Sequence, residues 1–294
     1  RSNFFLWRPG MDSVQTEQAA RSPLSWKGKL AIEWATALLH AGSLSRLAIQ
    51  TPTPQIPKPN LLLEGNSIGE LAIVALPLFL FCHDSPIKLR QSLEWILDSS
   101  QETQFAQLLT FGYALAQLLQ EQGNPQSLVS QTVYQLKQSG FSLEVQQGLT
   151  AWLAEVEQCV QQRVSLSQAI ATLMPTAAAT SADGVIGLAL YCFLTTPDHL
   201  VLSLRRAAQA SDQAATVAAL TGALAGAYNS ILEIPLEWHL ALLDDRQPLI
   251  WGASGIEIQA LATRLLTSWS GVYDATDELI KLPAIAAPGV IRPR

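Results

Sequence analysis

The sequence predicts an all-α fold, in which a multi-helix bundle forms one domain. Three observations carry this prediction. Leu, Ala and Gln dominate the chain, where a sheet would need β-branched and aromatic residues. Apolar residues recur at three- and four-residue steps, which is the helical period. No convincing run of alternating apolar and polar residues indicates a sheet.

Composition and charge narrow the class of protein. Of the 294 residues, 49% are hydrophobic and only 14% are charged, which supports a sizeable core and argues against disorder. The net charge of −6 disfavours nucleic acid as a partner, because phosphate binding needs clustered Lys and Arg. The nearest approach to a cluster is Arg205-Arg206. We interpret this pair as the solvated end of a helix.

The apolar runs and the cysteines indicate where in the cell the protein is expected. The longest apolar run, Leu71 to Cys82, contains Pro77 and is shorter than the ~20 residues that a spanning helix needs. Cys82, Cys159 and Cys192 lie far apart among apolar neighbours, without the spacing of a zinc site. They suit buried free thiols in a reducing compartment. We therefore expect a cytoplasmic protein that makes no contact with a membrane.

The order of the elements follows from local signals. Residues 1–25 show no sustained period and are expected to be a poorly ordered lead to one domain over residues 26–294. From Trp26 the pattern is helical, with Leu30, Trp34 and Leu38 on one stripe. Four prolines within residues 51–59 predict an extended loop. Further helices are predicted over residues 67–83 (kinked or divided at Pro77), 86–97, 101–122, 126–138, 143–162, 165–173, 182–194, 197–209, 212–228 and 254–269.

Helix ends can be assigned from residue types. Gly140 is a plausible C-cap for the helix over residues 126–138, and Ser254 is a plausible N-cap. Thr196-Pro197 offers a helix start, with Thr196 as the cap and Pro197 as the first helical residue. Ile234-Pro235 opens another helix.

The helix over residues 212–228 has small residues on every face. Gly222 and Gly226 stand four apart within it, and each costs ~1 kcal/mol relative to Ala in a helix interior. We expect such a helix to be central and crowded by its neighbours.

The segment from Asp183 to Trp238 carries a family resemblance. A helix ending in Leu-Tyr-x-Phe-Leu is followed by an amphipathic helix and an Asp-containing turn. Next come Thr-Val-Ala-Ala-Leu-Thr-Gly-Ala-Leu-Ala-Gly-Ala-Tyr and Ile-Pro-x-x-Trp. This order resembles the ADP-ribosylglycohydrolase family. The resemblance implies an all-α fold that hydrolyses the bond between ADP-ribose and a modified side chain, using two Mg²⁺ or Mn²⁺ ions held by carboxylates.

The family's metal-binding carboxylates are mostly missing here. Ala215 and Gln213 stand where the family has the two aspartates of Asp-x-Asp-Thr, and Asp212 is one residue too early. The family's acidic Asp-Asp-Thr motif near the N-terminus is not visible either. The candidate pocket residues are Asp212, Gln213, Thr216, Asp183 and Asn66, the last from a Gly-Asn segment vaguely like the family's. No metal cofactor is expected, and Mg²⁺ or Mn²⁺ would bind only if the site survives.

Three hypotheses remain open. The first is a degenerate member of the family that binds an ADP-ribose-like ligand or another protein without di-metal hydrolysis. The second is an active hydrolase with ligands from unexpected positions, such as Asp212, Asp183 or Glu70. The third is a helical scaffold without a ligand.

Overall fold

The computed structural model describes residues 24–41, 67–96, 102–120, 123–174, 184–210, 213–229, 231–243 and 253–270. Within these ranges the chain is helical and forms no strand, so the all-α prediction is confirmed. The helices are α2 (Leu24–Ala41), α4 (Ile68–Val74), α5 (Leu76–Phe81), α6 (Pro86–Ile96), α7 (Glu102–Leu119), α8 (Leu128–Gln138), α9 (Leu143–Gln161), α10 (Leu166–Leu173), α11 (Gly184–Thr195), α12 (Leu200–Ala207), α13 (Ala214–Tyr228), α14 (Leu236–Leu243) and α15 (Gly255–Trp269), with a 3₁₀ turn at Ile231–Glu233.

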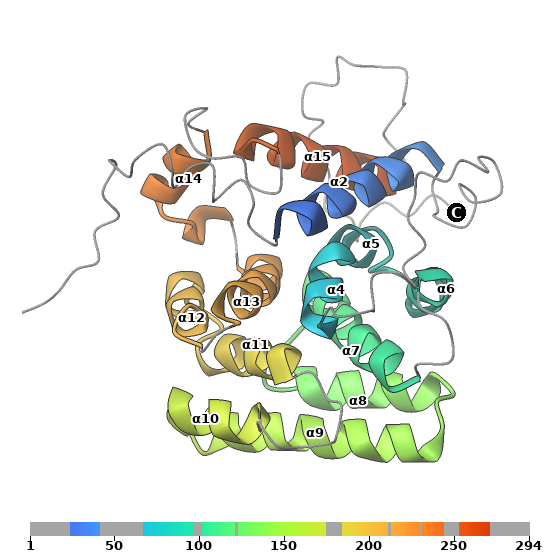
Figure 1. Ribbon diagram of the computed structural model, residues 1–294, viewed down its shortest axis with the longest axis vertical. Coiled ribbons are helices and arrows are strands. Elements are labelled where there is room, and N and C mark those ends of the chain that lie inside the picture. Colours follow the sequence, from blue (N-terminus) through green and yellow to red (C-terminus); the bar gives the residue numbers. More distant parts are fainter. Residues whose placement is uncertain are drawn as a thin grey trace, which may run out of the picture.

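The helices pack in layers around two central elements (Figure 1). α8, α9 and α10 lie at the bottom of the view, and α2 and α15 lie together at the top. Between them, α7 is buried from Phe105 to Leu118 and α11 from Gly184 to Phe193. Helices that are apolar on all sides need neighbours on all sides. α7 and α11 are therefore the helices around which the others pack.

Local capping signals explain several of the helix ends. Ser254 and Glu257 form a reciprocal capping box at the start of α15, which confirms Ser254 as its N-cap. Gly140 follows α8 with φ of +70°, a left-handed conformation that favours glycine and confirms its place at the helix end. Pro77 stands in the first turn of α5, directly after the break at Ala75 that separates α5 from α4. The predicted division of residues 67–83 is thus confirmed.

Some predicted boundaries move, and two predicted segments lie outside the described residues. α2 begins at Leu24, so the predicted lead over residues 1–25 is two residues too long. The rest of that lead and the proline-rich segment over residues 51–59 fall outside the described ranges.

The predicted helix start at Thr196-Pro197 is wrong. α12 begins at Leu200, and His199 is its N-cap. The Thr196 hydroxyl lies 2.9 Å from the Ser203 hydroxyl, which itself donates to the Thr196 carbonyl at 2.8 Å. The Asn229 amide donates to the Pro197 carbonyl at 2.8 Å. These contacts hold residues 196–198 as a turn against α12 and the end of α13.

As expected for a helix rich in small residues, α13 is crowded by its neighbours α4, α7, α11 and α12, but not on every face. Its buried residues lie on one side, whereas Gly226 is exposed and a Cβ added there would meet nothing within 4 Å. Gly222 and Gly226 line an apolar hollow of about 360 Å³ that α2, α5, α7 and α15 also border. The small residues therefore shape a hollow on one face and permit close packing on the other.

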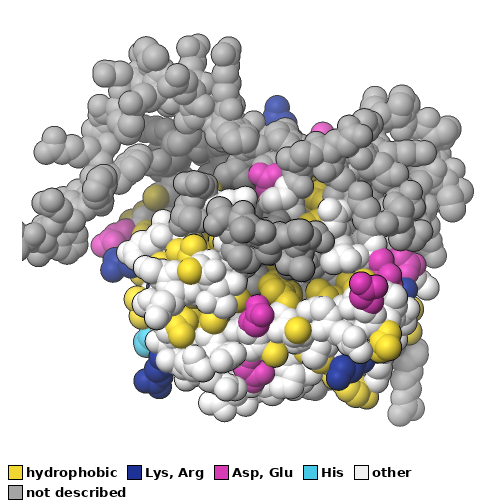
Figure 2. All heavy atoms as spheres, turned by 60° about the horizontal axis from the view of Figure 1, so that its bottom comes forward, with side chains coloured by type: hydrophobic (Ala, Val, Ile, Leu, Met, Phe, Trp, Pro, Cys, Tyr) yellow, Lys and Arg dark blue, Asp and Glu magenta, His cyan; other side chains and the backbone are white. Residues whose placement is uncertain are grey.

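The charged side chains are dispersed. Figure 2 brings the lower layer of Figure 1 forward and shows the Lys and Arg side chains of this face separated from one another. Arg206 lies at the end of α12, as predicted, with its guanidinium 5.8 Å from the centre of the Tyr191 ring. No helix in the part of the chain that the structure describes has both the length and the apolar character needed to cross a bilayer.

A carboxylate joins the starts of α7 and α9. Ser142 donates to Glu102 twice, from its backbone N–H to Oε1 at 2.6 Å and from its hydroxyl to Oε2 at 2.9 Å. Both bonds favour the ionised carboxylate, so they lower the pKa of Glu102. A lowered folded-state pKa contributes stability that is present above the unfolded-state value and is lost as the pH falls through the folded-state value.

We expect Glu102→Gln to destabilise the protein at pH 7, because the neutral amide accepts weaker bonds from Ser142. The difference from the unsubstituted protein should shrink as the pH falls below about 4.3, the ordinary value for Glu. Urea unfolding at pH 7 and pH 3.5 measures this. Ser142→Ala removes only one of the two donors. Its loss of stability relative to the unsubstituted protein should therefore change less between pH 7 and pH 3.5 than the loss caused by Glu102→Gln. A gap that stays constant over this range would contradict the prediction.

Candidate functional site

The starts of three helices meet at one point in the middle of the bundle. Gly69 is the second residue of α4, Val185 is the second of α11, and Thr216 is the third of α13. A Cβ added at Gly69 would lie 2.7 Å from Cγ1 of Val185 and 3.1 Å from Cγ2 of Thr216. Real Cβ atoms rarely tolerate such contacts, so only glycine allows this approach. Figure 1 shows α4, α11 and α13 as neighbours.

The start of α13 is electrostatically suited to an anion. The first turn of a helix has unbonded N–H groups and carries a partial positive charge. At α13 the N-cap residue is Gln213, whose side chain makes no capping bond, and the first turn holds no acidic residue. α11 likewise has no acidic residue in its first turn. α4 differs, because the Glu70 N–H donates to the Ser67 hydroxyl and the Ser67 N–H donates to the Glu70 carboxylate, both at 3.3 Å.

The predicted site residues divide into two groups. Gln213 and Thr216 lie together in the first turn of α13, where Gln213 is half-buried and Thr216 is 6% exposed. Asn66, Asp183 and Asp212 lie outside the described residues. In the sequence, Asn66 directly precedes Ser67 at the start of α4, and Asp183 directly precedes Gly184 at the start of α11. Asp212 directly precedes Gln213, the N-cap of α13.

The described residues do not fit a two-ion centre. Ala215, which the resemblance sets against one of the family's aspartates, is exposed and offers only a methyl group. The Gln213 amide is a neutral oxygen donor, which is weaker than a carboxylate for Mg²⁺ or Mn²⁺. The Glu70 carboxylate accepts from the backbone of its own helix. Among the described residues, no three His, Cys, Asp or Glu side chains are grouped so as to hold a metal ion.

The cysteines do not form a nucleophilic site. All three are buried free thiols, as predicted. Burial raises the pKa of Cys192 to about 12, although the nearby Arg206 opposes this shift. Burial also raises the pKa values of Cys82 and Cys159. Because the thiolate is the reactive form, these thiols are poor nucleophiles at neutral pH.

The sequence analysis missed Gly69 and Val185, which bring the three helix starts together. The available signal was a glycine in the first turn of an apolar helix, two residues after a capping serine. A glycine at such a position suggests that another element approaches closely. The sequence does not reveal that the approaching side chains are Val185 and Thr216, because more than 100 residues separate them from Gly69.

Fold and site together define an all-α protein whose central feature is a cluster of helix N-termini. The profile of the ADP-ribosylglycohydrolase family matches residues 14–275, which is most of the chain. The chain therefore belongs to the ADP-ribosylglycohydrolase family. No curated protein and no solved structure matches it.

Proposed function

We propose that this protein binds an ADP-ribose-like ligand at the start of α13 and does not cleave it by two-metal chemistry. One comparison carries the proposal: the resemblance places Ala215 and Gln213 at the two positions where the family has metal-binding aspartates. Family membership supplies the ligand class. The cluster of helix N-termini supports binding of its diphosphate.

The two neutral residues affect the binding of phosphate as well as the binding of metal ions. In a site with two aspartates, metal ions must offset the repulsion between carboxylates and the diphosphate of the ligand. Ala215 and Gln213 are neutral, so these two positions supply neither this repulsion nor carboxylate ligands for a metal ion. The partial positive charge at the start of α13 then attracts phosphate without a metal ion. Because Ala215 is small and exposed, its side chain leaves the neighbouring N–H groups approachable.

We expect Ala215→Glu to weaken binding of ADP-ribose about tenfold, because one added carboxylate beside a phosphate costs on the order of 1 kcal/mol. Isothermal titration in EDTA measures the affinity. The fold should survive, since the position is exposed and Glu is favourable in a first helical turn. Leu143→Glu is the matched control, because Leu143 is the 71% exposed first residue of α9. It should leave the affinity unchanged.

An assay for release of ADP-ribose and the same binding measurement, both on the unsubstituted protein, test the other two hypotheses. Mn²⁺-dependent release of ADP-ribose from a modified protein would indicate an active hydrolase, with ligands such as Asp212, Asp183 or Glu70. Absence of ADP-ribose binding in both EDTA and Mn²⁺ would leave a helical scaffold or a protein-binding role. Binding in EDTA that is equally strong in Ala215→Glu would place the ligand elsewhere and contradict the proposed site.

A further inference from the structure

The apolar hollow beside α13 is large enough for a small molecule. Its volume is about 360 Å³, within the range of about 300–1,000 Å³ that is usual for ligand sites. Every described residue that lines it is Ala, Gly, Ile, Leu or Pro. None of them belongs to α4 or α11, and α13 contributes only residues from Gly222 to Ala227. The hollow is therefore separate from the proposed ADP-ribose site at the start of α13.

The hollow has a closed floor and an open mouth. α2, α5 and α15 contact one another on one side, and α13 lies on the other side (Figure 1). α5 and α13 both contact α7, whose Leu115 is fully buried and forms part of the floor. Leu80, Gly226 and Ala262 line the hollow from three different helices and are exposed. A ligand can therefore enter without unfolding of the bundle.

Contacts outside the hollow join three of its walls. His83 follows α5, and the centre of its ring lies 4.6 Å from that of Trp269, the last residue of α15. The side-chain amide of Gln120, directly after α7, donates to the His83 carbonyl at 2.6 Å. Each of these three residues is within about one helical turn of a leucine that lines the hollow. The spacing of α5, α7 and α15 is thus fixed by other contacts, and the hollow is pre-formed, as ligand sites usually are.

The glycines of α13 are not explained by close packing. Glycine in a helix interior costs stability relative to alanine. At Gly69 of α4 a tight contact accounts for it, because an added Cβ would lie 2.7 Å from Val185. A Cβ added at Gly226 would meet nothing within 4 Å, and one at Gly222 would meet only Cδ2 of Leu204, at 3.3 Å. Both glycines line the hollow, so the space beside α13 is the feature that they share.

A polar cleft of about 470 Å³ adjoins the hollow between α2 and α15, because Ile32, Ile258 and Leu261 line both. Its lining includes two cationic and two anionic side chains, those of Lys29, Arg264, Glu33 and Glu257. Their charges balance, so the cleft favours neither sign of a ligand. An apolar hollow beside a polar cleft matches a ligand that has one apolar part and one polar part.

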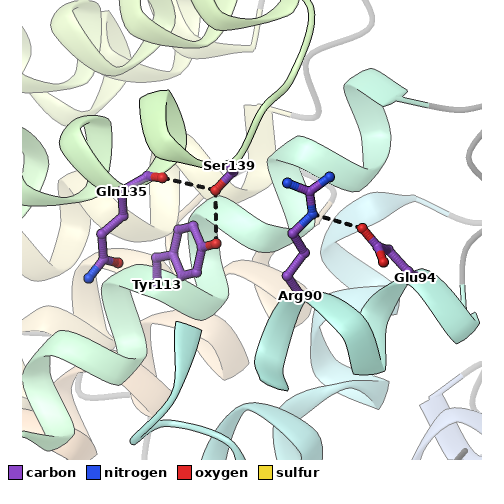
Figure 3. Close-up of polar contacts among 5 residues, drawn as sticks. All are labelled: Arg90, Glu94, Tyr113, Gln135 and Ser139. Carbon is purple, nitrogen blue, oxygen red and sulfur yellow. Dashed lines mark hydrogen bonds and ion pairs between the residues drawn. The ribbon is translucent and has the colours of Figure 1, made fainter. Parts of the chain in front are cut away.

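A larger polar cleft of about 790 Å³ lies between α6, α7 and α8, but the side chains drawn in Figure 3 pair with one another. The Tyr113 hydroxyl lies 2.9 Å from Ser139 Oγ, which donates to the Gln135 carbonyl at 2.9 Å. Arg90 Nε lies 2.7 Å from Glu94 Oε1. These contacts are complete within the protein and indicate no particular ligand, whereas the lining of the apolar hollow does.

We propose that the apolar hollow binds the hydrocarbon chain of an amphiphilic ligand, such as a fatty acyl chain, and leaves the polar head outside. The lining has no side-chain donor or acceptor, so a polar group inside would lose its hydrogen bonds to water. Each methylene that moves from water into the hollow is favourable. An apolar cavity of about 150 Å³ accepts benzene, so a hollow of about 360 Å³ has room for roughly twelve carbons.

The test is isothermal titration of the full chain with hexanoate, octanoate, decanoate, dodecanoate and tetradecanoate, each below its critical micelle concentration. The dissociation constant should fall about fourfold with each added methylene, because each buries a similar apolar area. It should stop falling near about twelve carbons, when the hollow is full. n-Decyl-β-maltoside, which has the chain length of decanoate and an uncharged head, should bind within several-fold of decanoate.

Gly226→Leu should weaken decanoate binding about tenfold or more, because the new side chain takes up space that the ligand needs. It should not lower the melting temperature, since its Cβ meets nothing and leucine is a better helix former than glycine. Ala262→Leu, at an exposed position on the opposite wall, should weaken binding in the same way. Gly148→Leu is the matched control, because a Cβ there also meets nothing and α9 does not line the hollow. It should leave the affinity unchanged.

An affinity that does not depend on chain length, or that is unchanged in Gly226→Leu, would overturn the proposal. Binding of decanoate without binding of decyl maltoside would overturn it in favour of an anion site. Dimerisation that Gly226→Leu abolishes, with no binding of any probe, would overturn it in favour of a second copy of the chain. ADP-ribose binding should survive in Gly226→Leu, because Gly226 lies about 15 Å along α13 from Thr216. The two sites can therefore fail independently.

Discussion

Replacing Trp34 with alanine is expected to destabilise the protein by about 3–5 kcal/mol, the usual cost of truncating a buried tryptophan. Trp34 is 1% exposed and belongs to the central hydrophobic cluster, although residues 42–66 separate α2 from the next described helix in sequence. α2 packs against α4, α5 and α15. The cavity left by the indole would therefore open between helices from both ends of the chain.

Equilibrium unfolding in guanidinium chloride measures this effect and tests the single-domain prediction. If α2 and the rest of the bundle form one cooperative unit, Trp34→Ala should shift one transition without splitting it. Trp34→Phe should cost less, because it leaves a smaller cavity and removes an indole N–H that has no partner among the described residues. Trp238→Ala, at a 38% exposed position, is the surface control. Two separate transitions, or no loss of stability, would show that α2 is not part of this core.

Much of the fold is predictable because its signals are local. Pro77 has no N–H and is well tolerated only in the first turn of a helix, so the start of a new helix at α5 follows from one residue. The capping box at Ser254 and Glu257 needs residues only three apart. Gly140 ends α8 for an equally local reason, its left-handed backbone. Such features do not depend on which helices become neighbours.

Predictions that depend on neighbours were less successful. Thr196-Pro197 has the residue types of a helix start, but bonds from Ser203 and Asn229 hold it as a turn. Ser203 belongs to α12 itself, but Asn229 comes from the end of α13, and no local pattern shows that contact. The composition of α13 predicts close packing, but it does not say which face packs. Gly69 is in tight contact, whereas Gly226 in α13 borders a hollow.

The candidate site, too, could be predicted only as far as its features are local in the sequence. Family resemblance identifies Gln213 and Ala215 at the aspartate positions, because that comparison needs only the sequence around one helix start. It also leads to Thr216, which the structure buries against α4. The convergence of three helix starts is a property of packing, and it depends on the absence of one side chain at Gly69.

Because the meeting of the three helix starts depends on the missing side chain at Gly69, Gly69→Ala is the second substitution with a large expected effect. The added methyl would lie 2.7 Å from Cγ1 of Val185, a side chain that is fully buried and has little room to move. Overpacking of this kind costs typically about 1–3 kcal/mol, and it should exceed the gain of about 1 kcal/mol from replacing glycine by alanine in a helix. It should also weaken ADP-ribose binding, because the starts of α4, α11 and α13 are forced apart.

A double-mutant cycle with Val185→Ala distinguishes this clash from a general effect of the substitution. Val185→Ala alone leaves a cavity and should destabilise the protein, but it removes the atom that Gly69→Ala would strike. The double variant should therefore be more stable than the sum of the single effects by about 1–2 kcal/mol, a typical coupling for residues in contact. Gly148→Ala is the matched control, since a Cβ there meets nothing within 4 Å and the position is exposed on α9. It should stabilise the protein by up to about 1 kcal/mol. Additive effects of Gly69→Ala and Val185→Ala would mean that the helix starts do not meet as described, and that the proposed anion site lacks its structural basis.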